Sequence, residues 1–282
     1  MKSNGQSTYK LDRLDFMVAY SCNISCAGCI SISDIKRSGI EPIDKLVNSI
    51  DKWKLLLDPE IVSIFGGEPC LHPKLQDICS EIRTAWPNTV IRLITNGYFL
   101  DRFDSSVWFD FSPFEMQISI HRKDHESLIN DKIKNILNHQ RPWKVSIQGG
   151  TDSHRQITWT HDNFVVYKSI FRDFMPPYKK VENRFFPWYS DPEKAHKICG
   201  APNTPILYKG KLYKCPAVAN IIDITNENWF NYTGVDSADG LEEFVKNIGV
   251  PESVCGQCPD SSQAIIDHFD KENVIVRHKN IS

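Results

Sequence analysis

Short apolar runs alternate with amphipathic stretches over much of the chain, from about residue 14 to residue 186. The runs are rich in Ile, Val, Leu and Phe, a composition typical of strands that are buried on both faces. This alternation predicts strands at Asp15–Ala19, Ile61–Phe65, Val90–Ile94, Met116–Ile120 and Gln156–Thr160, with a weaker one near Val181–Phe185.

The stretches between these strands carry apolar residues at helical spacing, which predicts helices over Ile43–Ile50, Leu75–Ala85 and Leu128–Leu137. Alternating strands and helices favour right-handed crossover units around a parallel sheet. Six such units are fewer than the eight of a closed barrel. We therefore predict an α/β fold built on an open, partial (β/α)6 barrel.

Two segments depart from this alternation. Lys144–Ile147 and Gln156–Thr160 flank a pair of glycines, which predicts a β-hairpin at the fifth strand position. After Pro187, prolines, glycines and short runs replace the long helices. We predict a barrel domain at residues 12–190 and a small C-terminal α+β domain at residues 191–282.

The composition limits the kinds of partner and the cellular location that we expect. Lys and Arg (33) nearly balance Asp and Glu (35), so the chain lacks the basic excess typical of nucleic-acid-binding proteins. No apolar run approaches the roughly 18 residues needed to cross a bilayer, and the polar N-terminus does not resemble a signal peptide. We expect a cytoplasmic protein with no nucleic-acid partner and no membrane partner.

Nine cysteines are many for 282 residues, and in a reducing compartment clustered cysteines favour metal binding or catalysis over disulfides. Three of them, Cys22, Cys26 and Cys29, directly follow the first predicted strand. Structural zinc takes four ligands, whereas three thiolates can hold a four-iron cluster with one iron open to a small molecule. A zinc loop and chance clustering remain alternatives at this point.

The spacing Cys-x3-Cys-x2-Cys resembles that of the radical S-adenosylmethionine (SAM) superfamily. A second motif of that family, Gly-Gly-Glu-Pro, follows the second predicted strand, and Asn96 and Ser119 lie at the ends of the next two. Gly28 departs from the family, in which the residue before the third cysteine is usually aromatic. The resemblance implies that the three cysteines bind a 4Fe-4S cluster. It also implies SAM-binding positions at Gly28, Gly66, Gly67, Glu68, Pro69, Asn96 and Ser119.

Four further cysteines lie in the last third of the chain and could complete a site for zinc or for an iron–sulfur cluster: Cys199, Cys215, Cys255 and Cys258. A predicted hairpin around residues 208–213 and a predicted helix at Leu241–Ile248 lie between them. This order resembles the Twitch domain of radical SAM enzymes, and the resemblance implies that the four cysteines bind one auxiliary 4Fe-4S cluster. Cys70 and Cys79 are left over, and we expect both to be buried thiols.

The resemblance implies reductive cleavage of SAM to a 5′-deoxyadenosyl radical, which abstracts hydrogen from a substrate. A short barrel with one auxiliary cluster is similar to the aminocyclitol alcohol dehydrogenases, small-molecule oxidoreductases in which the auxiliary cluster accepts an electron. The expected low-potential electron donor is a flavodoxin or a ferredoxin. Weak candidates for catalytic or substrate-anchoring residues are Arg155, His161, Arg172 and Arg184.

Two other functions fit the same motifs. The first is a peptide- or protein-modifying maturase, an epimerase or a cross-link-forming enzyme, which would take a peptide substrate. Such enzymes often carry an N-terminal peptide-binding domain, for which we expect no room before Cys22. The second is a non-catalytic iron–sulfur electron carrier, which would not need the Gly-Gly-Glu-Pro motif. We therefore expect oxidation of a small molecule.

Overall fold

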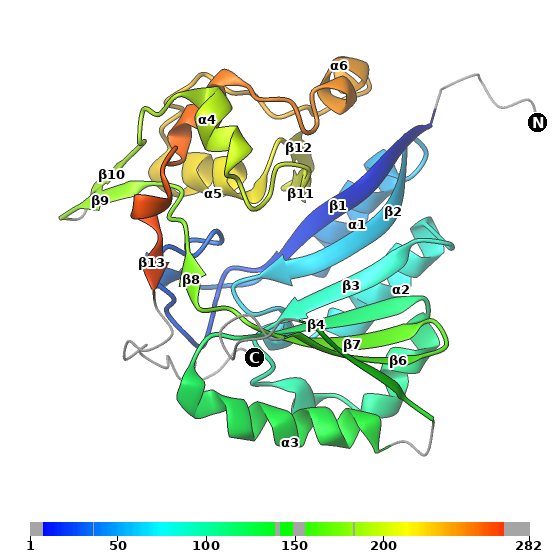
Figure 1. The fold of residues 1–282 in the computed structure, drawn as a ribbon. Coiled ribbons are helices and arrows are strands. Elements are labelled where there is room, and N and C mark those ends of the chain that lie inside the picture. The colour runs from blue at the N-terminus through cyan, green and yellow to red at the C-terminus, as the bar shows by residue number, and fades with distance from the viewer. Residues whose placement is uncertain (1–7, 36, 139–141, 149–155, 183, 268–282) are drawn as a thin grey trace, which may run out of the picture.

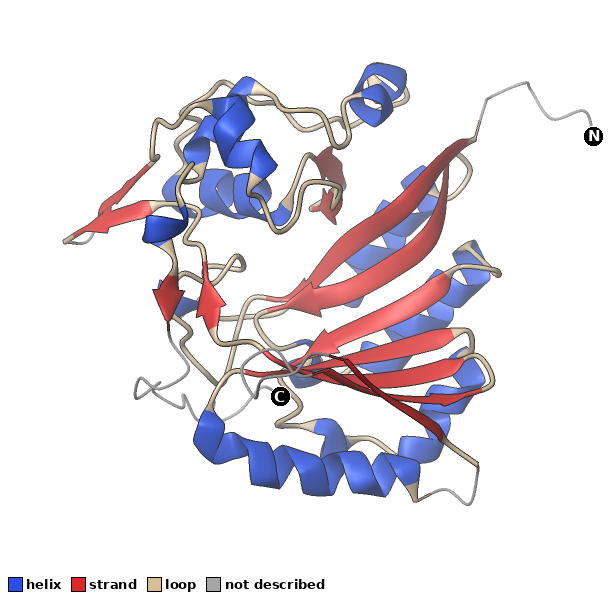
Figure 2. Ribbon diagram, viewed as in Figure 1, coloured by secondary structure: helices blue, strands red, loops and turns tan. Residues whose placement is uncertain are grey.

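A nine-stranded sheet forms the centre of the structure, a computed structural model that describes residues 8–35, 37–138, 142–148, 156–182 and 184–267. The strands lie in the order β12-β11-β1-β2-β3-β4-β7-β6-β5, so the barrel is open between β12 and β5 (Figure 1, Figure 2). Their bounds are β1 (Tyr9–Ala19), β2 (Leu57–Gly66), β3 (Val90–Thr95), β4 (Phe114–Ile120), β5 (Lys144–Gln148), β6 (Gln156–His161), β7 (Phe164–Ile170), β11 (Ile206–Tyr208) and β12 (Lys211–Tyr213).

The parallel part of the sheet confirms the predicted partial barrel. β1, β2, β3, β4 and β7 are parallel neighbours, with Asp15 opposite Ser63 and Ser119 opposite Ser169. β6 and β5 continue the sheet as an antiparallel pair, which confirms the predicted hairpin.

The fifth parallel strand differs from the prediction. Gln156–Thr160 lies in β6, which is antiparallel to its neighbour, and the strand that pairs in parallel with β4 is β7. Two features of the sequence make β7 difficult to predict. Only Asp162 and Asn163 separate it from β6, and the buried Lys168 interrupts its apolar face. Lys168 is tolerated inside because its Nζ lies 2.7 Å from the Glu126 carboxylate.

The prediction of a sixth barrel strand near Val181–Phe185 is wrong. These residues fall in β9 (Lys179–Val181) and β10 (Arg184–Phe186), which pair with each other in a separate sheet. Among the described residues, the sixth parallel strand is β11. It pairs with β1, at the opposite end of the parallel set from β7. Since β11 comes from beyond residue 190, the strand–helix alternation of the barrel segment could not predict it.

Three predicted helices pack against the sheet and bury one face of each (Figure 2). Apolar residues at helical spacing, such as Ile50, Ile78 and Ile133, are buried. They join a core with alternate strand residues such as Phe16 and Leu93. Burying a side chain of this size contributes about 1.5–3 kcal/mol, so this core is a main source of stability. The helices are α1 (Ile43–Trp53), α2 (Leu75–Ala85) and α3 (Glu126–Leu137).

The C-terminal segment shares the core of the barrel. Its β11–β12 hairpin, which the sequence predicts around residues 208–213, joins the sheet beside β1. Leu207, Leu212 and Leu241 belong to the same hydrophobic cluster as the barrel strands. The predicted boundary near residue 190 thus separates two segments that share one sheet. The helices of this segment are α4 (Pro192–Lys197), α5 (Pro216–Thr225) and α6 (Leu241–Lys246).

A short antiparallel pair, β8 (Asp173–Phe174) and β13 (Ile266–Asp267), joins the chain that leaves β7 to the end of the described residues. It lies on the side to which the arrowheads of β1 to β4 point (Figure 1). Of the helices in the described residues, none is both long enough and apolar enough to cross a membrane.

Candidate iron–sulfur and cofactor site

The loops that follow β1, β2, β3 and β4 lie at one edge of the sheet, where the carboxyl ends of parallel strands meet (Figure 1). Parallel α/β sheets bind ligands at this edge. It carries the three cysteines after β1, the Gly-Gly-Glu-Pro turn after β2, Asn96 after β3 and Ser119 near the end of β4. The fold therefore brings the predicted motifs to one place.

The loop of residues 22–29 keeps its cysteines largely away from solvent. Cys26 is 5% exposed, and its carbonyl oxygen accepts a hydrogen bond from the Cys29 N–H at 3.3 Å. Burial, followed by the nearby Glu68 carboxylate, raises the pKa of the Cys22 thiol. A buried thiol of this kind loses its proton when it binds a metal cation, so the loop suits a metal centre better than a reactive free thiolate.

Gly66 and Gly67 bring the end of β2 against the chain that enters the cysteine loop. The Gly67 N–H donates to the Ala19 carbonyl at 2.7 Å, and the next N–H, of Glu68, donates to the Ser21 carbonyl at 2.8 Å. A Cβ on Gly66 would lie 2.2 Å from the Ala19 oxygen. A Cβ on Gly67 would lie 2.1 Å from the Ser21 oxygen. The close contact between the end of β2 and the chain at Ala19 and Ser21 therefore requires glycine at both positions.

Gly67→Ala is expected to destabilise the protein by about 3 kcal/mol, because the new Cβ would overlap backbone that can retreat only if the cysteine loop moves. Gly200→Ala is the matched control, since a Cβ at that position meets no atom within 4 Å. Thermal unfolding measures the difference. Equal unfolding midpoints for the two variants would contradict this account of the turn.

Glu68 joins the ends of β2 and β3 from a fully buried position. Its Oε1 accepts hydrogen bonds from the Thr95 hydroxyl at 2.6 Å and the Cys70 N–H at 2.9 Å. Its Oε2 accepts one from the Asn96 N–H at 2.8 Å. Burial nevertheless raises the pKa of this carboxyl. Both oxygens are engaged by protein donors, so Glu68 positions the turn, and its contact with a cofactor stays a prediction.

Asn96 extends this network to the cysteine loop through a residue that the sequence analysis missed. Its side-chain amide donates to Asn23 Oδ1 at 2.8 Å and lies 3.8 Å from Cys22 Sγ. The Tyr98 N–H in turn donates to Asn96 Oδ1 at 3.0 Å. The one sequence signal for Asn23 is its place directly after the first cysteine, since residues beside a metal ligand help to orient it.

Gly28 adopts a positive φ of 77° and lies beside β8. A Cβ at this position would be 3.3 Å from Pro176 Cβ and 3.4 Å from Phe174 Cβ. The site therefore has no space for an aromatic side chain at position 28. Phe174 supplies an aromatic ring from another segment instead, and His121 stacks on it with ring centroids 5.5 Å apart.

A small cavity opens beside the cysteine loop, at the ends of β3 and β4. Asn96 contacts both the loop and this cavity, whereas Ser119 is nearly buried, at 4% exposure. Burial lowers the pKa of His125, so this ring is neutral at physiological pH and can both donate and accept a hydrogen bond. The residues that line the cavity are Ile24, Asn96, Tyr98, Ile120, His121, His125 and Ile129.

The four weak catalytic candidates do not gather at this site. Arg172 follows β7 by two residues, on the same edge of the sheet. His161 ends the antiparallel β6 and therefore lies at the opposite edge, where its Nδ1 is 3.2 Å from the Pro142 oxygen. Arg184 lies in β10, in a separate sheet. Arg155 lies outside the described residues.

The four C-terminal cysteines come together from three parts of the chain. Cys199 follows α4, Cys215 caps the N-terminus of α5, and Cys255 and Cys258 lie in the turn at residues 253–258. Burial raises the pKa of Cys199 and Cys258 and raises that of Cys215 to about 12. The thiols are also close enough to raise the pKa values of one another. The fold thus brings these cysteines near one another, and their role as ligands of a cluster stays a prediction.

All nine cysteines lie in the described residues, and none forms a disulfide. Cys70 and Cys79 are fully buried, as predicted. Within the described part of the chain, no group of three or more His, Cys, Asp or Glu side chains is arranged to hold a single metal ion. The cysteine ligands of a four-iron cluster each bind a different iron atom, so they need not surround one point.

Comparison with solved structures identifies the fold, although no family model and no curated protein matches the sequence. The crystal structure of BtrN in complex with S-adenosylmethionine and 2-DOIA matches 89% of this chain and 94% of its own chain, with 15% identity and a TM-score of 0.51. The chain shares the fold of BtrN. An open conformation of BtrN matches 86% of this chain and 82% of its own, with 13% identity and a TM-score of 0.42. Tagged anSMEcpe with bound SAM matches 46% of this chain and 41% of its own, with 19% identity and a TM-score of 0.37.

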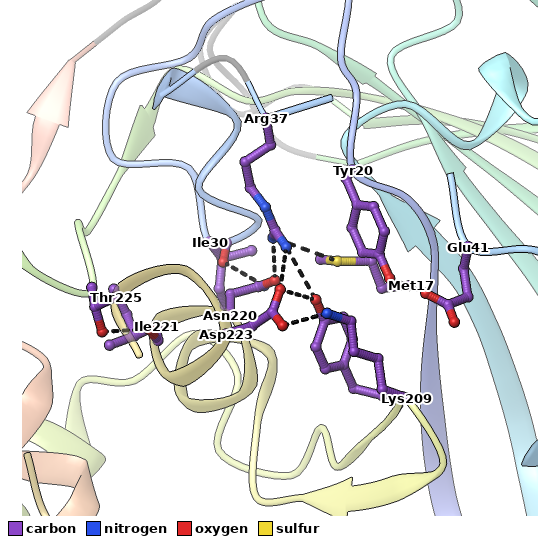
Figure 3. A network of polar contacts seen from close by, with 11 residues as sticks. Met17, Tyr20, Ile30, Arg37, Glu41, Lys209, Asn220, Ile221, Asp223 and Thr225 are labelled. Carbon is purple, nitrogen blue, oxygen red and sulfur yellow. Dashed lines mark hydrogen bonds and ion pairs between the residues drawn. The ribbon is translucent and has the colours of Figure 1, made fainter. Parts of the chain in front are cut away.

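Within this BtrN-like fold, Arg37, which follows the cysteine loop in the sequence, binds the C-terminal segment (Figure 3). The Arg37 guanidinium donates to Asn220 Oδ1 at 2.7 Å and to Asp223 Oδ2 at 2.9 Å, both in α5. It also donates to the Tyr208 hydroxyl at 3.0 Å and lies 4.8 Å from the centre of the Tyr20 ring. Since α5 begins directly after one of the C-terminal cysteines, this network holds the two cysteine-bearing regions in a fixed relation.

Arg37→Met is expected to lower the free energy of unfolding by about 2 kcal/mol, because half-buried acceptors in α5 lose their charged donor. Amide hydrogen exchange in α5 should accelerate at the same time. Lys54→Met is the control: it breaks an ion pair whose side chains are 40% and 54% exposed, and we expect a change below about 0.5 kcal/mol. Unchanged exchange in α5 of the Arg37 variant would show that the network does not hold the two regions together.

Proposed function

We propose that this chain is a radical SAM enzyme, which cleaves SAM reductively and uses the 5′-deoxyadenosyl radical to abstract hydrogen from a substrate. One observation carries the proposal. The cysteine loop leaves the carboxyl end of β1 and is held by backbone hydrogen bonds against the Gly-Gly-Glu-Pro turn, on a fold shared with BtrN. A zinc loop or a simple electron carrier has no need of that turn.

The residues of the chain have separate tasks in this proposal. Cys22, Cys26 and Cys29 would hold the 4Fe-4S cluster, which supplies the low-potential electron when bound. Glu68 keeps the turn and the strand ends in place through its three buried hydrogen bonds. Asn96 lines the adjacent cavity together with Ile24 and Ile120.

We propose further that the four C-terminal cysteines bind an auxiliary 4Fe-4S cluster and that the reaction oxidises a small molecule. A cluster whose irons are all bound by cysteine has no open position for substrate, so electron transfer suits it best. The match to BtrN over most of both chains supports this choice, because that structure holds 2-DOIA together with SAM. A flavodoxin or ferredoxin would supply the first electron.

Release of 5′-deoxyadenosine tests the enzyme class. Protein reconstituted without oxygen and reduced with dithionite is mixed with SAM, and the products are separated by chromatography. We expect 5′-deoxyadenosine and methionine in equal amounts, above the level of a Cys26→Ala control. No release above that control would favour an iron–sulfur electron carrier.

Metal analysis tests the auxiliary cluster independently. Two four-iron clusters require about eight irons per chain and an equal number of sulfides. About four irons with one zinc would exclude the second cluster and leave the first intact.

A further inference from the structure

Asn23 carries a buried polar atom that has no hydrogen-bond partner among the described residues. The residue is 1% exposed, and its Nδ2 makes no hydrogen bond. A buried amide nitrogen left unpaired costs about 1–3 kcal/mol, so proteins keep very few of them. A group bound beside the first cysteine would give this donor a partner.

Neighbouring hydrogen bonds fix which way the Asn23 amide faces. The Tyr98 N–H donates to Asn96 Oδ1, so the other end of the Asn96 amide is its NH2 group. That group donates to Asn23 Oδ1 at 2.8 Å. Turning the Asn23 amide over would place two NH2 groups against each other, which is unfavourable. Its nitrogen must therefore be the atom without a partner.

The unpaired nitrogen belongs to the surroundings of the first cysteine. Asn23 Oδ1 lies 4.0 Å from Cys22 Sγ, and the nitrogen is bonded to the same carbon as this oxygen. A cluster bound by Cys22 would bring further sulfur atoms into the surroundings of this amide. Thiolate and sulfide sulfurs accept hydrogen bonds from N–H groups, and hydrogen bonds to the sulfurs are one determinant of a cluster's reduction potential.

We propose that Asn23 donates a hydrogen bond through Nδ2 to a sulfur of the cluster held by Cys22, Cys26 and Cys29, and that this bond raises the reduction potential of the cluster. The inference rests on the proposed function, since it needs that cluster. Reduction adds one negative charge to the cluster, and an N–H donor stabilises the reduced form more than the oxidised form. Asn96 orients Asn23 as a positioning residue, and its own amide nitrogen lies 3.8 Å from Cys22 Sγ.

A redox titration followed by electron paramagnetic resonance tests this bond in the full reconstituted chain without SAM. The first cluster is recognised afterwards as the signal that changes when SAM is added. Asn23→Leu and Asn23→Asp both remove the donor, and Asp keeps an acceptor for Asn96. At a fixed potential near the midpoint, we expect the reduced-to-oxidised ratio of both variants to fall at least threefold, about 28 mV at 59 mV per tenfold. Ser63→Ala, which changes a fully buried side chain within β2, should leave the midpoint unchanged.

The outcomes separate the inference from the proposed function. A SAM-responsive cluster whose midpoint is the same in wild-type and Asn23→Leu protein overturns the inference alone. A drop only in Asn23→Asp would show an effect of charge and also overturn it. The absence of any SAM-responsive cluster in the wild type overturns both.

A measurement on wild-type protein covers the case in which the variants do not fold. Residues 1–25 are synthesised with 15N in the Asn23 side chain alone and joined at Cys26 to the rest of the chain, so that Asn96, whose amide lies 3.8 Å from Cys22 Sγ, carries no label. The protein is then reduced, and the cluster signal is examined by pulsed electron paramagnetic resonance. A coupling between the cluster and a labelled amide nitrogen supports the bond, and its absence overturns the inference.

Discussion

Cys26→Ala is expected to abolish 5′-deoxyadenosine release and to lower the iron content from about eight to about four atoms per chain. Cys26 is 5% exposed, and its backbone carbonyl accepts a hydrogen bond from the Cys29 N–H. No other cysteine can therefore take its place unless the loop changes conformation. Two remaining thiolates would not hold a cluster with one defined open iron. Iron analysis and chromatography of the reaction products measure the two effects.

Cys79→Ala is the matched control for this substitution. Cys79 is fully buried on α2 and packs in the hydrophobic core, so the change should cost roughly 1 kcal/mol and preserve both iron and activity. If Cys26→Ala protein released 5′-deoxyadenosine at the wild-type rate, the first cysteine group could not be the cluster site.

Glu68→Ala is expected to lower the free energy of unfolding by about 3 kcal/mol or more and to reduce iron retention at the first site. The substitution leaves three buried donors without their acceptor, each at a cost of about 1–3 kcal/mol. For a chain of this size, 3 kcal/mol corresponds to a fall of roughly 6–12 °C in Tm. The turn that holds the cysteine loop would then lose its anchor on β3. Calorimetry and iron analysis of the same sample measure both effects.

Glu60→Ala is the control, because Glu60 is exposed in the same strand and should change the unfolding free energy by less than about 0.5 kcal/mol. Glu68→Gln, which keeps one acceptor oxygen, should fall between the two. An alanine variant at position 68 as stable as the Glu60 variant would refute the anchoring role.

The pH dependence of stability provides a second test of the burial of the Glu68 carboxyl. Burial raises the pKa of this carboxyl in the folded protein above the unfolded value of about 4.3. The folded state therefore binds the proton of Glu68 more tightly than the unfolded state does. This proton binding contributes fully to the free energy of unfolding below about pH 4, and the contribution is lost as pH rises through the folded pKa. The stability of Glu68→Gln protein should decline less over this range than that of the wild type, as measured by chemical denaturation.

The parts of the fold that the sequence predicted are those set by local pattern. Strands with mostly apolar runs, such as Ile61–Phe65, and helices with a clear apolar stripe occur close to where they were expected. β7 was missed because Lys168 breaks its apolar face, and that lysine is tolerated only through Glu126 on another element. β11 was missed as a barrel strand because its partner, β1, lies far away in the sequence.

The candidate site divides in the same way. Cysteine spacing is a property of a short segment, so the loop at residues 22–29 could be predicted from its chemistry alone. The roles of Glu68, Asn23 and Arg37 could not be predicted from the sequence, because each role is defined by hydrogen bonds to residues from other strands or from α5. His161 shows the converse case. It was a reasonable candidate by residue type, but the antiparallel direction of β6 carries it to the wrong edge of the sheet.

Mössbauer spectroscopy of protein reconstituted with 57Fe, recorded before and after addition of SAM, tests the central claim most directly. The account predicts a four-iron cluster in which one iron differs from the other three, and in which the spectrum of that iron alone shifts when SAM binds. A spectrum without a four-iron cluster at the first site, or one in which no iron responds to SAM, would contradict it.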